Sequence, residues 1–404
     1  MTLIVTSRER RNQFLLFFYF GMTTLALATR APNLKANLHV DNGTYGTLIS
    51  FGAVGGVLSM MVAGQIVDRI GVGPILITMS ALMYGSIMVM PHIHTPWIYL
   101  IVNIAFAFGL NAYNIALHHQ SLRRQELSGE RTIPKMHGAW SLGTLISTVL
   151  SIIVTSHVSL AWHIDVLVGA MWVGTLWSVF QMRPFLISGS EKRDESEPAI
   201  GIKSAFAMLT TDRYMAIAYL CAVMVEFSTN NWVTLSSHQE IKASTTLSIV
   251  PYLMFMVGMT GGRLNAHRLL ALKPEAYWIR VSSRIGGSSF ILFLLLAKFS
   301  APHSFAIAFT FEILGFFIGG LCGSFFAGFI TQIASQRSNL PAGVVVAQLG
   351  LAISALSFVV QLVISWVAQS TTITYALMIP GALMIALSYF KKLGPREVKV
   401  QATH

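Results

Sequence analysis

The stretch from Trp97 to His119 reads WIYLIVNIAFAFGLNAYNIALHH, twenty-three consecutive residues without an Asp, Glu, Lys or Arg. At a rise of about 1.5 Å per residue, a helix of this length crosses the ~30 Å hydrocarbon layer of a bilayer. Similar stretches recur along the 404-residue chain, which is 54% apolar and 11% charged, whereas a soluble domain carries about 25% charged residues. The composition excludes a soluble enzyme or a disordered protein and indicates an integral membrane protein.

Hydropathy predicts an all-α integral membrane protein with twelve transmembrane helices, grouped as six, a gap and six. Because each span and its loop take about 33 residues, no long domain fits outside the membrane. The expected spans are 12–34, 44–66, 74–91, 97–119, 136–157, 161–183, 214–235, 247–267, 277–298, 305–333, 342–367 and 372–391.

The gap between the sixth and seventh spans is too polar to enter a bilayer, with a charged run that begins at Glu191. The sequence therefore predicts two pseudo-symmetric halves. These are an N-terminal six-helix bundle over 1–183 and a C-terminal six-helix bundle with a short cytoplasmic tail over 214–404. A cytoplasmic linker over 184–213 joins them.

The net charge of +11 is interpreted by its position relative to the spans, and not as a sign of nucleic-acid binding. With the N-terminus inside, only Lys35, Lys242 and Lys298 fall outside. This asymmetry predicts a multi-pass protein of the plasma (inner) membrane with both termini in the cytoplasm. The basic residues expected on the cytoplasmic side, apart from those of the linker, are Arg8, Arg10, Arg11, Arg69, Arg123, Arg124, Arg131, Lys135, Arg337, Lys391, Lys392, Arg396 and Lys399.

The first expected span also has features of a secretory signal, because a basic start precedes an apolar run and Ala26-Leu27-Ala28. The run is longer than the apolar core of a signal, and eleven more spans follow. We expect it to be retained as the first transmembrane helix.

The loop after the second expected span contains Gly64-Gln-Ile-Val-Asp68-Arg69-Ile-Gly71. It resembles the G-x-x-x-D-R-x-G signature of the major facilitator superfamily of transporters, and with twelve spans and a polar linker the resemblance covers nearly the whole chain. The resemblance implies a conformational latch, in which Gly64 allows close helix approach, Asp68 accepts hydrogen bonds from a neighbouring helix N-terminus and Arg69 pairs with an acid across the two halves. The basic residues that usually follow are absent, which weakens the latch. An ordinary Asp-Arg tight turn is the alternative.

Further features resemble the branch of this superfamily related to fucose permease. They are Arg30-Ala31-Pro32, His137-Gly-Ala-Trp-Ser-Leu-Gly143, and Glu226 followed by Asn230-Asn231-Trp232. The branch does not name a substrate. The fifth span lacks the Gly-Pro signature of many drug/proton antiporters, which disfavours multidrug efflux. In the second half, the loop expected around Gly262 and Arg263 keeps basic residues but lacks the Asp.

Amide side chains mark the expected substrate cavity. Transporters that the chain resembles line a central cavity with helices 1, 4, 7 and 10, flanked by 2, 5, 8 and 11. Asn103, Asn111 and Asn114 share one face of the fourth span, and Asn230 and Gln361 lie in the seventh and eleventh. Amides are costly to bury in lipid, so we expect them to face water, substrate or partners. Such walls suit a hydrogen-bonding solute, such as a sugar-like molecule.

Ionisable residues inside the spans cost about 3 kcal/mol each at mid-membrane. Glu226 and Glu312 are placed roughly 18 and 20 Å from the cytoplasmic face by the helical rise, at similar depth. We hypothesise that they supply the proton-coupling or substrate-contacting acid. The alternative is a carboxylate locked to Arg or amide groups for assembly. For Arg30 and Asp165, near the outer face, the alternatives are a salt bridge between the first and sixth spans, or Arg30 binding an anionic substrate group or gating the outer mouth.

No catalytic residue, metal site or cofactor is predicted. His118 and His137 flank the loop between the fourth and fifth spans, where an interfacial role competes with proton transfer. No spacing indicates zinc, and Cys221 and Cys322 are interpreted as packing residues. A Gly-rich phosphate loop with Lys-Ser/Thr is absent from the sequence, which argues against ATP hydrolysis.

The sequence therefore predicts a secondary active transporter, not an enzyme, that moves a small organic solute by alternating access. Symport with protons is the expected mode, and the expected partners are the solute, the proton gradient and the lipid bilayer. An efflux permease for amphipathic drugs or metabolites is the alternative. A channel or a membrane-embedded enzyme is the alternative of another class. Since one chain contains both halves, a monomer is expected.

Overall fold

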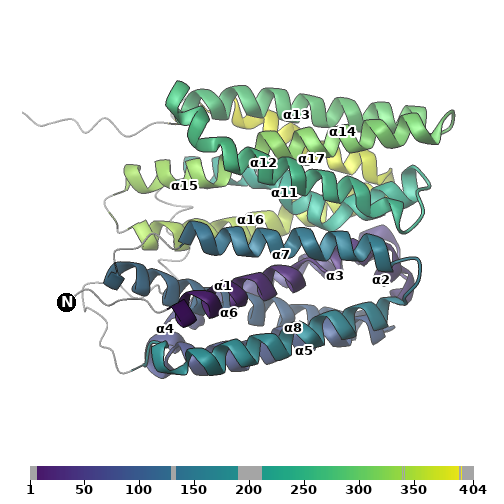
Figure 1. Ribbon diagram of the computed structural model, residues 1–404. Coiled ribbons are helices and arrows are strands. Elements are labelled where there is room, and N and C mark those ends of the chain that lie inside the picture. Colours follow the sequence, from purple (N-terminus) through teal and green to yellow (C-terminus); the bar gives the residue numbers. More distant parts are fainter. Residues whose placement is uncertain are drawn as a thin grey trace, which may run out of the picture.

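The computed structural model describes residues 7–128, 133–189, 212–338, 340, 342–390 and 393, and within them the chain is helical (Figure 1). The long helices lie side by side along one direction. In chain order, with η marking a short 3-10 helix, the elements are α1 (Ser7–Thr24), η1 (Ala28–Arg30), α2 (Ala31–Leu38), α3 (Asn42–Ser50), α4 (Gly52–Ile70), α5 (Val72–Val89), η2 (Met90–His92), α6 (Pro96–Ser128), α7 (Ile133–Val154), α8 (Leu160–Met182), η3 (Arg183–Phe185), α11 (Arg213–Glu240), η4 (Leu247–Ile249), α12 (Val250–Leu272), α13 (Glu275–Ser300), α14 (Phe305–Gly323), α15 (Phe326–Arg337), α16 (Ala342–Ser370) and α17 (Ile373–Leu387).

Within the described residues, ten helical segments are long and apolar enough to cross a membrane, so the protein is a multi-pass membrane protein. Several of these segments join two elements, such as α1 with α2, α3 with α4, and α14 with α15. The seventh and twelfth expected spans correspond to α11 and α17, which fall outside this set; α17 is apolar but has only 15 residues. The predicted all-α membrane fold is confirmed, and the prediction of twelve spans is confirmed for ten.

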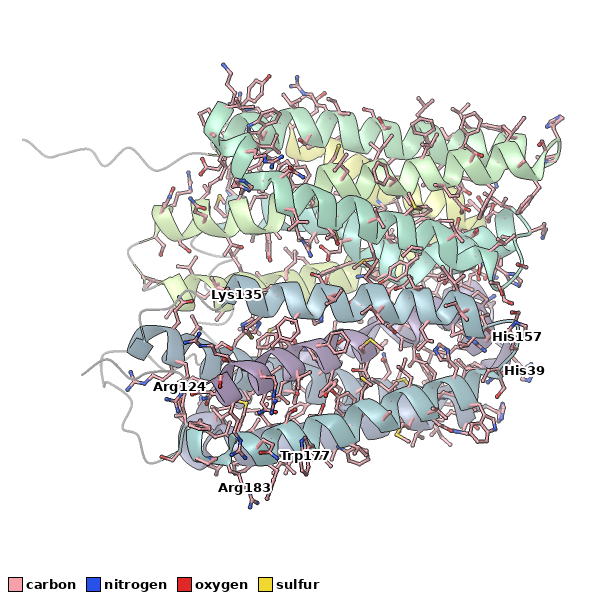
Figure 2. All side chains as sticks on the ribbon, in the orientation of Figure 1. His39, Arg124, Lys135, His157, Trp177 and Arg183 are labelled. Carbon is pink, nitrogen blue, oxygen red and sulfur yellow. The ribbon has the colours of Figure 1, made fainter. Side chains whose placement is uncertain are left out.

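The two ends of the helix bundle hold different segments of the chain. We call the end with the N-terminus and residues 183–189 the N-terminal end, and the opposite end, with the α2–α3 and α7–α8 connections, the far end (Figure 1). Arg124, Lys135 and Arg183 project at the N-terminal end, and His39 and His157 at the far end (Figure 2). Arg124 and Lys135 thus share the end that the charge pattern assigned to the cytoplasm.

The helices before residue 190 pack mainly on one another, as do those after residue 211. The first set joins α1 to α7 and α8, α4 to α6, and α5 to α6 and α8, and the second joins α12 and α13 to α14, and α17 to α11 and α13. Contacts between the sets run through α3 and α4 with α16, α2 with α11, and α7 with α12. Residues 190–211 of the expected linker lie outside the described residues.

The far-end contact between the two sets is tight. The backbone N–H of Asn42 donates to Gln369 Oε1 at 2.9 Å, and the Asn42 Nδ2 donates to Gln239 Oε1 at 3.1 Å. Thr234 Oγ1 of α11 donates to the carbonyl of Ala28 at 2.9 Å. Between described residues, the hydrogen bonds that join the two sets of helices lie at this end. The structure is therefore closed at the far end.

Candidate functional site

A charged pair inside the helix bundle joins α11 to α12. Arg263 Nη2 lies 3.4 Å from Glu226 Oε1 and 3.5 Å from Oε2. Arg263 Nε donates to the carbonyl of Ser324 at 3.1 Å. Ser324 stands where α14 gives way to α15, and a helix end leaves carbonyl groups without an intrahelical partner. One guanidinium therefore ties together α11, α12 and the break between α14 and α15.

Both side chains of this pair are partly exposed. The Glu226 side chain is 24% exposed and the Arg263 side chain 39%. Arg263 lies inside a membrane-spanning helix, in agreement with the expected span 247–267, whereas the loop expected around Gly262 and Arg263 is wrong because α12 continues to Leu272. The loop was expected there as the second-half equivalent of the Gly64–Gly71 motif, and hydropathy alone does not show that an acid inside the bundle balances Arg263.

Two histidines of the first set of helices face each other near this pair. The ring centroids of His118 on α6 and His137 on α7 lie 5.1 Å apart, and Phe17 of α1 packs edge-on against His118 at 5.4 Å. His137 also interacts electrostatically with Arg263, across the contact of α7 with α12. We call Glu226, Arg263, His118 and His137 the interface cluster, because two members come from each set of helices.

Tyrosine hydroxyls add hydrogen-bonding capacity beside the interface cluster. Tyr252 of α12 is fully buried, interacts electrostatically with Glu226, and its hydroxyl has no hydrogen-bond partner among the described residues. Tyr219 of α11 interacts with Glu226 and with Thr331 of α15. A carboxylate, a guanidinium, two imidazoles and phenol groups at one helix contact can exchange protons and hydrogen-bond a polar solute.

Glu312 does not join this cluster. It lies on α14 with 1% of its surface exposed, near Ser236 and Ser237 of α11, and its carboxylate oxygens form no hydrogen bond of normal geometry with described residues. Ser236 follows Glu226 by ten residues, or about 15 Å along α11 toward the far end. The expectation that the two acids lie at similar depth is therefore wrong, because Glu312 lies level with Ser236 and Ser237, nearer the far end than Glu226.

Two of the predicted amides bind backbone instead of lining open space. Asn103 Nδ2 donates to the carbonyls of Leu48 and Ile49 at 3.0 and 3.1 Å, near the end of α3. Asn111 Nδ2 donates to the carbonyl of Ala107, one turn back in its own helix, at 2.8 Å. In these positions the amide groups donate to backbone carbonyls within the helix bundle. Residue type and periodicity do not reveal these partners.

The remaining amides keep free capacity. Gln361 of α16 is buried, and its Nε2 donates to Ser228 Oγ of α11 at 3.4 Å. The Oε1 of Gln361 and the Oδ1 of Asn230 are buried without a hydrogen-bond partner among the described residues. Asn114 is half-buried on α6, four residues before His118. A role for these three amides in solute binding stays a prediction.

Arg30 and Asp165 do not form the expected salt bridge. Arg30 Nη1 donates to Thr155 Oγ1 and Nη2 to the carbonyl of Val158, both at 3.1 Å. Asp165 Oδ2 lies 2.9 Å from His92 Nε2. The structural alternative for Arg30 and Asp165 is wrong because each has a nearer partner in the loops at the far end, where sequence spacing gives no register between helices.

The predicted latch residues pack differently from the family pattern. Asp68 Oδ1 lies 3.8 Å from His119 Nε2 of α6, inside the same set of helices. Arg69 is exposed and forms no ion pair with another described residue, so the expected pairing across the halves is not seen. A Cβ placed at Gly64 would meet nothing within 4 Å, so the expected close approach at Gly64 is wrong in this conformation.

Gly71, the last residue of the motif, makes the turn between α4 and α5. Its φ of 86° lies in the left-handed region that favours glycine, and a Cβ there would come within 2.9 Å of the carbonyl of Ile187. The N–H of Val72 donates to the same carbonyl at 3.0 Å. The motif loop is thus anchored to the segment that follows α8.

No protein-family model matches the chain. An uncharacterized MFS-type (major facilitator superfamily) transporter of Yersinia pestis is 22% identical over 345 residues, which cover 83% of this chain and 82% of that protein. The crystal structure of the nucleoside transporter NupG is similar with a TM-score of 0.70 and 15% identity, over 97% of this chain and 99% of that one. The crystal structure of a D-xylose-proton symporter is similar with a TM-score of 0.73 and 12% identity, over 96% and 98% of the two chains. The chain therefore shares the fold of these two transporters, and its sequence is similar to that of an MFS-type transporter.

Proposed function

We propose that the protein is a secondary active transporter of the major facilitator superfamily that moves a small, hydrogen-bonding organic solute by alternating access, coupled to protons. The interface cluster is the observation that carries this proposal. In this cluster, an acid and a cation from one set of helices lie opposite two imidazoles from the other set. They lie at the contact of α7 with α12, which must change when the two sets of helices move. The fold neighbours, a nucleoside transporter and a D-xylose-proton symporter by name, support a polar solute.

The coupling step follows from the charge of Glu226. As a carboxylate, Glu226 holds Arg263, and the pair is close to neutral as a unit. A proton on Glu226 removes that attraction, so Arg263 keeps only the Ser324 carbonyl and becomes free to donate to a solute. Protonation of Glu226 and binding of the solute therefore favour each other through one guanidinium. His118 and His137 give the proton a route from the opposite set of helices.

The moving bodies in this proposal are the bundles over 1–183 and 214–404, joined by the linker over 184–213. With the N-terminal end in the cytoplasm of a cell whose plasma membrane holds the protein, closure at the far end corresponds to a state facing inward. Each chain carries both bundles, which supports function as a monomer.

The test is transport in proteoliposomes with Glu226→Gln. Sugars and nucleosides are offered with and without an inside-alkaline pH gradient, and counterflow is measured without a gradient. We expect Glu226→Gln to abolish gradient-driven accumulation and to keep counterflow, because the neutral amide resembles the protonated carboxyl and leaves Arg263 free to donate to a solute, but cannot take up or release a proton. Glu275→Gln at the start of α13 is the matched control. Undiminished proton-driven accumulation by Glu226→Gln would overturn the proposed coupling.

A further inference from the structure

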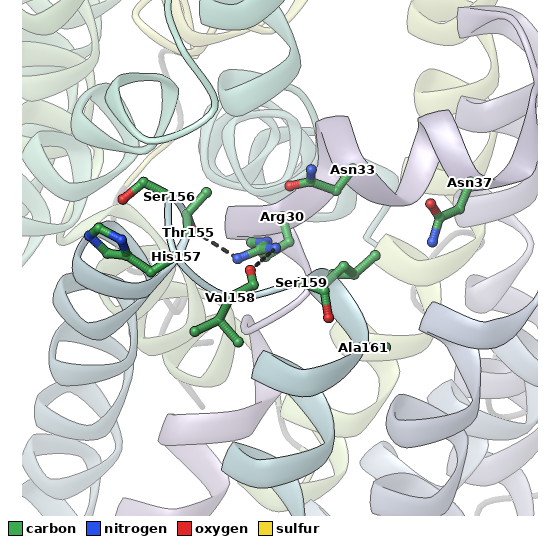
Figure 3. A pocket seen from close by; sticks show the side chains of 10 residues that line it. Arg30, Asn33, Asn37, Thr155, Ser156, His157, Val158, Ser159 and Ala161 are labelled. Carbon is green, nitrogen blue, oxygen red and sulfur yellow. Dashed lines mark hydrogen bonds between the residues drawn. The ribbon is translucent and has the colours of Figure 1, made fainter.

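A polar cavity lies at the far end, away from the interface cluster. It has a volume of about 500 Å³ and is lined by the η1–α2 segment and by the connection between α7 and α8. Arg30 and Asn33 stand on one side of it, and Thr155, Val158 and Ser159 on the other (Figure 3). No step of the proposed transport mechanism uses this cavity.

Arg30 is a buried cation whose charge is not balanced by any acid among the described residues. Only 2% of its surface is exposed, its two hydrogen bonds go to neutral oxygens, and its Nε has no partner among the described residues. The described acids at this end of the first set of helices are engaged elsewhere. Asp165 lies against His92, and Asp41 caps α3 by accepting from the N–H of Thr44. A buried charge of this kind is costly unless something pairs with it.

The surroundings of Arg30 add donors and no negative charge. His163 of α8 is 5% exposed, interacts electrostatically with Arg30, and neither of its ring nitrogens has a partner among the described residues. Asn33 lies beside Arg30 on the same side of the cavity (Figure 3), and Ser156 and Ser159 belong to its lining. A planar guanidinium with free N–H groups matches the two or three oxygens of a carboxylate or a phosphate.

We propose that this cavity binds the carboxylate or phosphate group of a small anionic solute that arrives from the far side of the membrane. The anion would supply the charge that Arg30 lacks. The cavity is also linked to the closure between the two sets of helices, because Thr234 of α11 donates to the carbonyl of Ala28, in the same 3-10 turn as Arg30. Transport of the anion as cargo rests on the proposed function, whereas binding of the anion in this cavity does not.

The test measures the thermal unfolding of the full chain, purified in detergent and freed of lipid, with sodium acetate or sodium phosphate against sodium chloride at equal ionic strength and pH. We expect a saturable rise in the unfolding midpoint with acetate, phosphate or both, because a ligand that binds only the folded state stabilises it. The same titration with phosphatidylglycerol micelles distinguishes a lipid headgroup from a soluble anion.

Two variants locate the effect. Arg30→Gln removes the cation, and Asn33→Asp places an acid beside an intact Arg30, so each should lose the anion-dependent rise. Asn33→Asp should also unfold at a higher temperature than the wild type without anion, because the new carboxylate pairs with Arg30; this keeps the test decisive if Arg30→Gln does not fold. Arg280→Gln, at the opposite end on α13, is the control and should respond like the wild type.

The outcomes separate this proposal from the transport proposal. No rise in the wild type, a rise that Asn33→Asp leaves unchanged, or a rise with phosphatidylglycerol alone would overturn the anion site. The binding assay needs neither a gradient nor a cargo, so its failure leaves the coupling role of Glu226 intact. Loss of coupling in Glu226→Gln likewise leaves anion binding intact.

Discussion

Arg263 is the residue on which the candidate site depends, because it binds a side chain of α11 and a carbonyl after α14 from its place on α12. We expect Arg263→Gln to lower the unfolding temperature, since Glu226 then remains half-buried without a cation. The double variant Glu226→Gln with Arg263→Gln should recover part of the loss.

A double-mutant cycle measures this coupling in the free energy of unfolding. Because both side chains are partly exposed, we expect about 1 kcal/mol. Additive effects of the two substitutions, within about 0.3 kcal/mol, would show that the pair contributes nothing to the folded state.

At this scale the sequence predicted which residues are unusual but not what they contact. Arg30, Asp165, Glu226 and Glu312 stand out because charged residues are rare in apolar spans. Their partners depend on helix rotation and on breaks such as that at Ser324, which an average over an apolar window does not detect. The ion pair of Glu226 was foreseen only as an alternative, with no Arg assigned to it.

Helices α4 and α6 pack with their backbones in contact at Gly55. A Cβ at Gly55 of α4 would overlap with the carbonyl of Ile104 on α6, whereas a Cβ at Gly64 of the same helix would meet nothing within 4 Å. We expect Gly55→Ala to lower the unfolding temperature by several degrees, because α4 and α6 must separate. Gly64→Ala is the matched control and should change stability little.

Thermal unfolding in detergent compares the two variants directly. Equal stability of Gly55→Ala and wild type would mean that α4 and α6 are not in backbone contact. For Gly64 the outcome also bears on the motif, since a large loss there would indicate that Gly64 is covered by another helix.

The sequence predicted the elements more fully than their interruptions. Apolar length alone located the spans, but the single helix expected over 305–333 is divided into α14 and α15, and the first expected span into α1, η1 and α2. Hydropathy sums over a span and is insensitive to a local turn, because the turn residues Ser324 and Phe325 do not lower the apolar average enough. These turns supply the carbonyl for Arg263 and the position of Arg30.

For the whole molecule, the decisive feature is the contact of α3 with α16 and α11 at the far end. A Cβ at Gly46 would overlap with Ser365 Oγ and come within 2.6 Å of the Trp232 ring. We expect Gly46→Val to force the far end open and, by alternating access, to close the N-terminal end. Thr47→Val, one residue along the same helix, is the control.

Distances between spin labels at Arg69→Cys and Gln336→Cys report this change, with Cys221 and Cys322 replaced by Ala. The labels lie on α4 and α15 at the N-terminal end, so the distance should shorten in Gly46→Val and stay unchanged in Thr47→Val. An unchanged distance in Gly46→Val would contradict rocking of the two bundles as rigid bodies.

The contact of α3 with α16 and α11 also bears on proton leakage across the membrane. Trp232 is fully buried where Gly46 meets α16, and a junction of this density has no room for a file of water molecules along which protons could hop. If the protein works by the proposed alternating access, this packing would keep the far end closed to protons while a solute leaves at the N-terminal end. The absence of a side chain at Gly46 is what permits so close a contact.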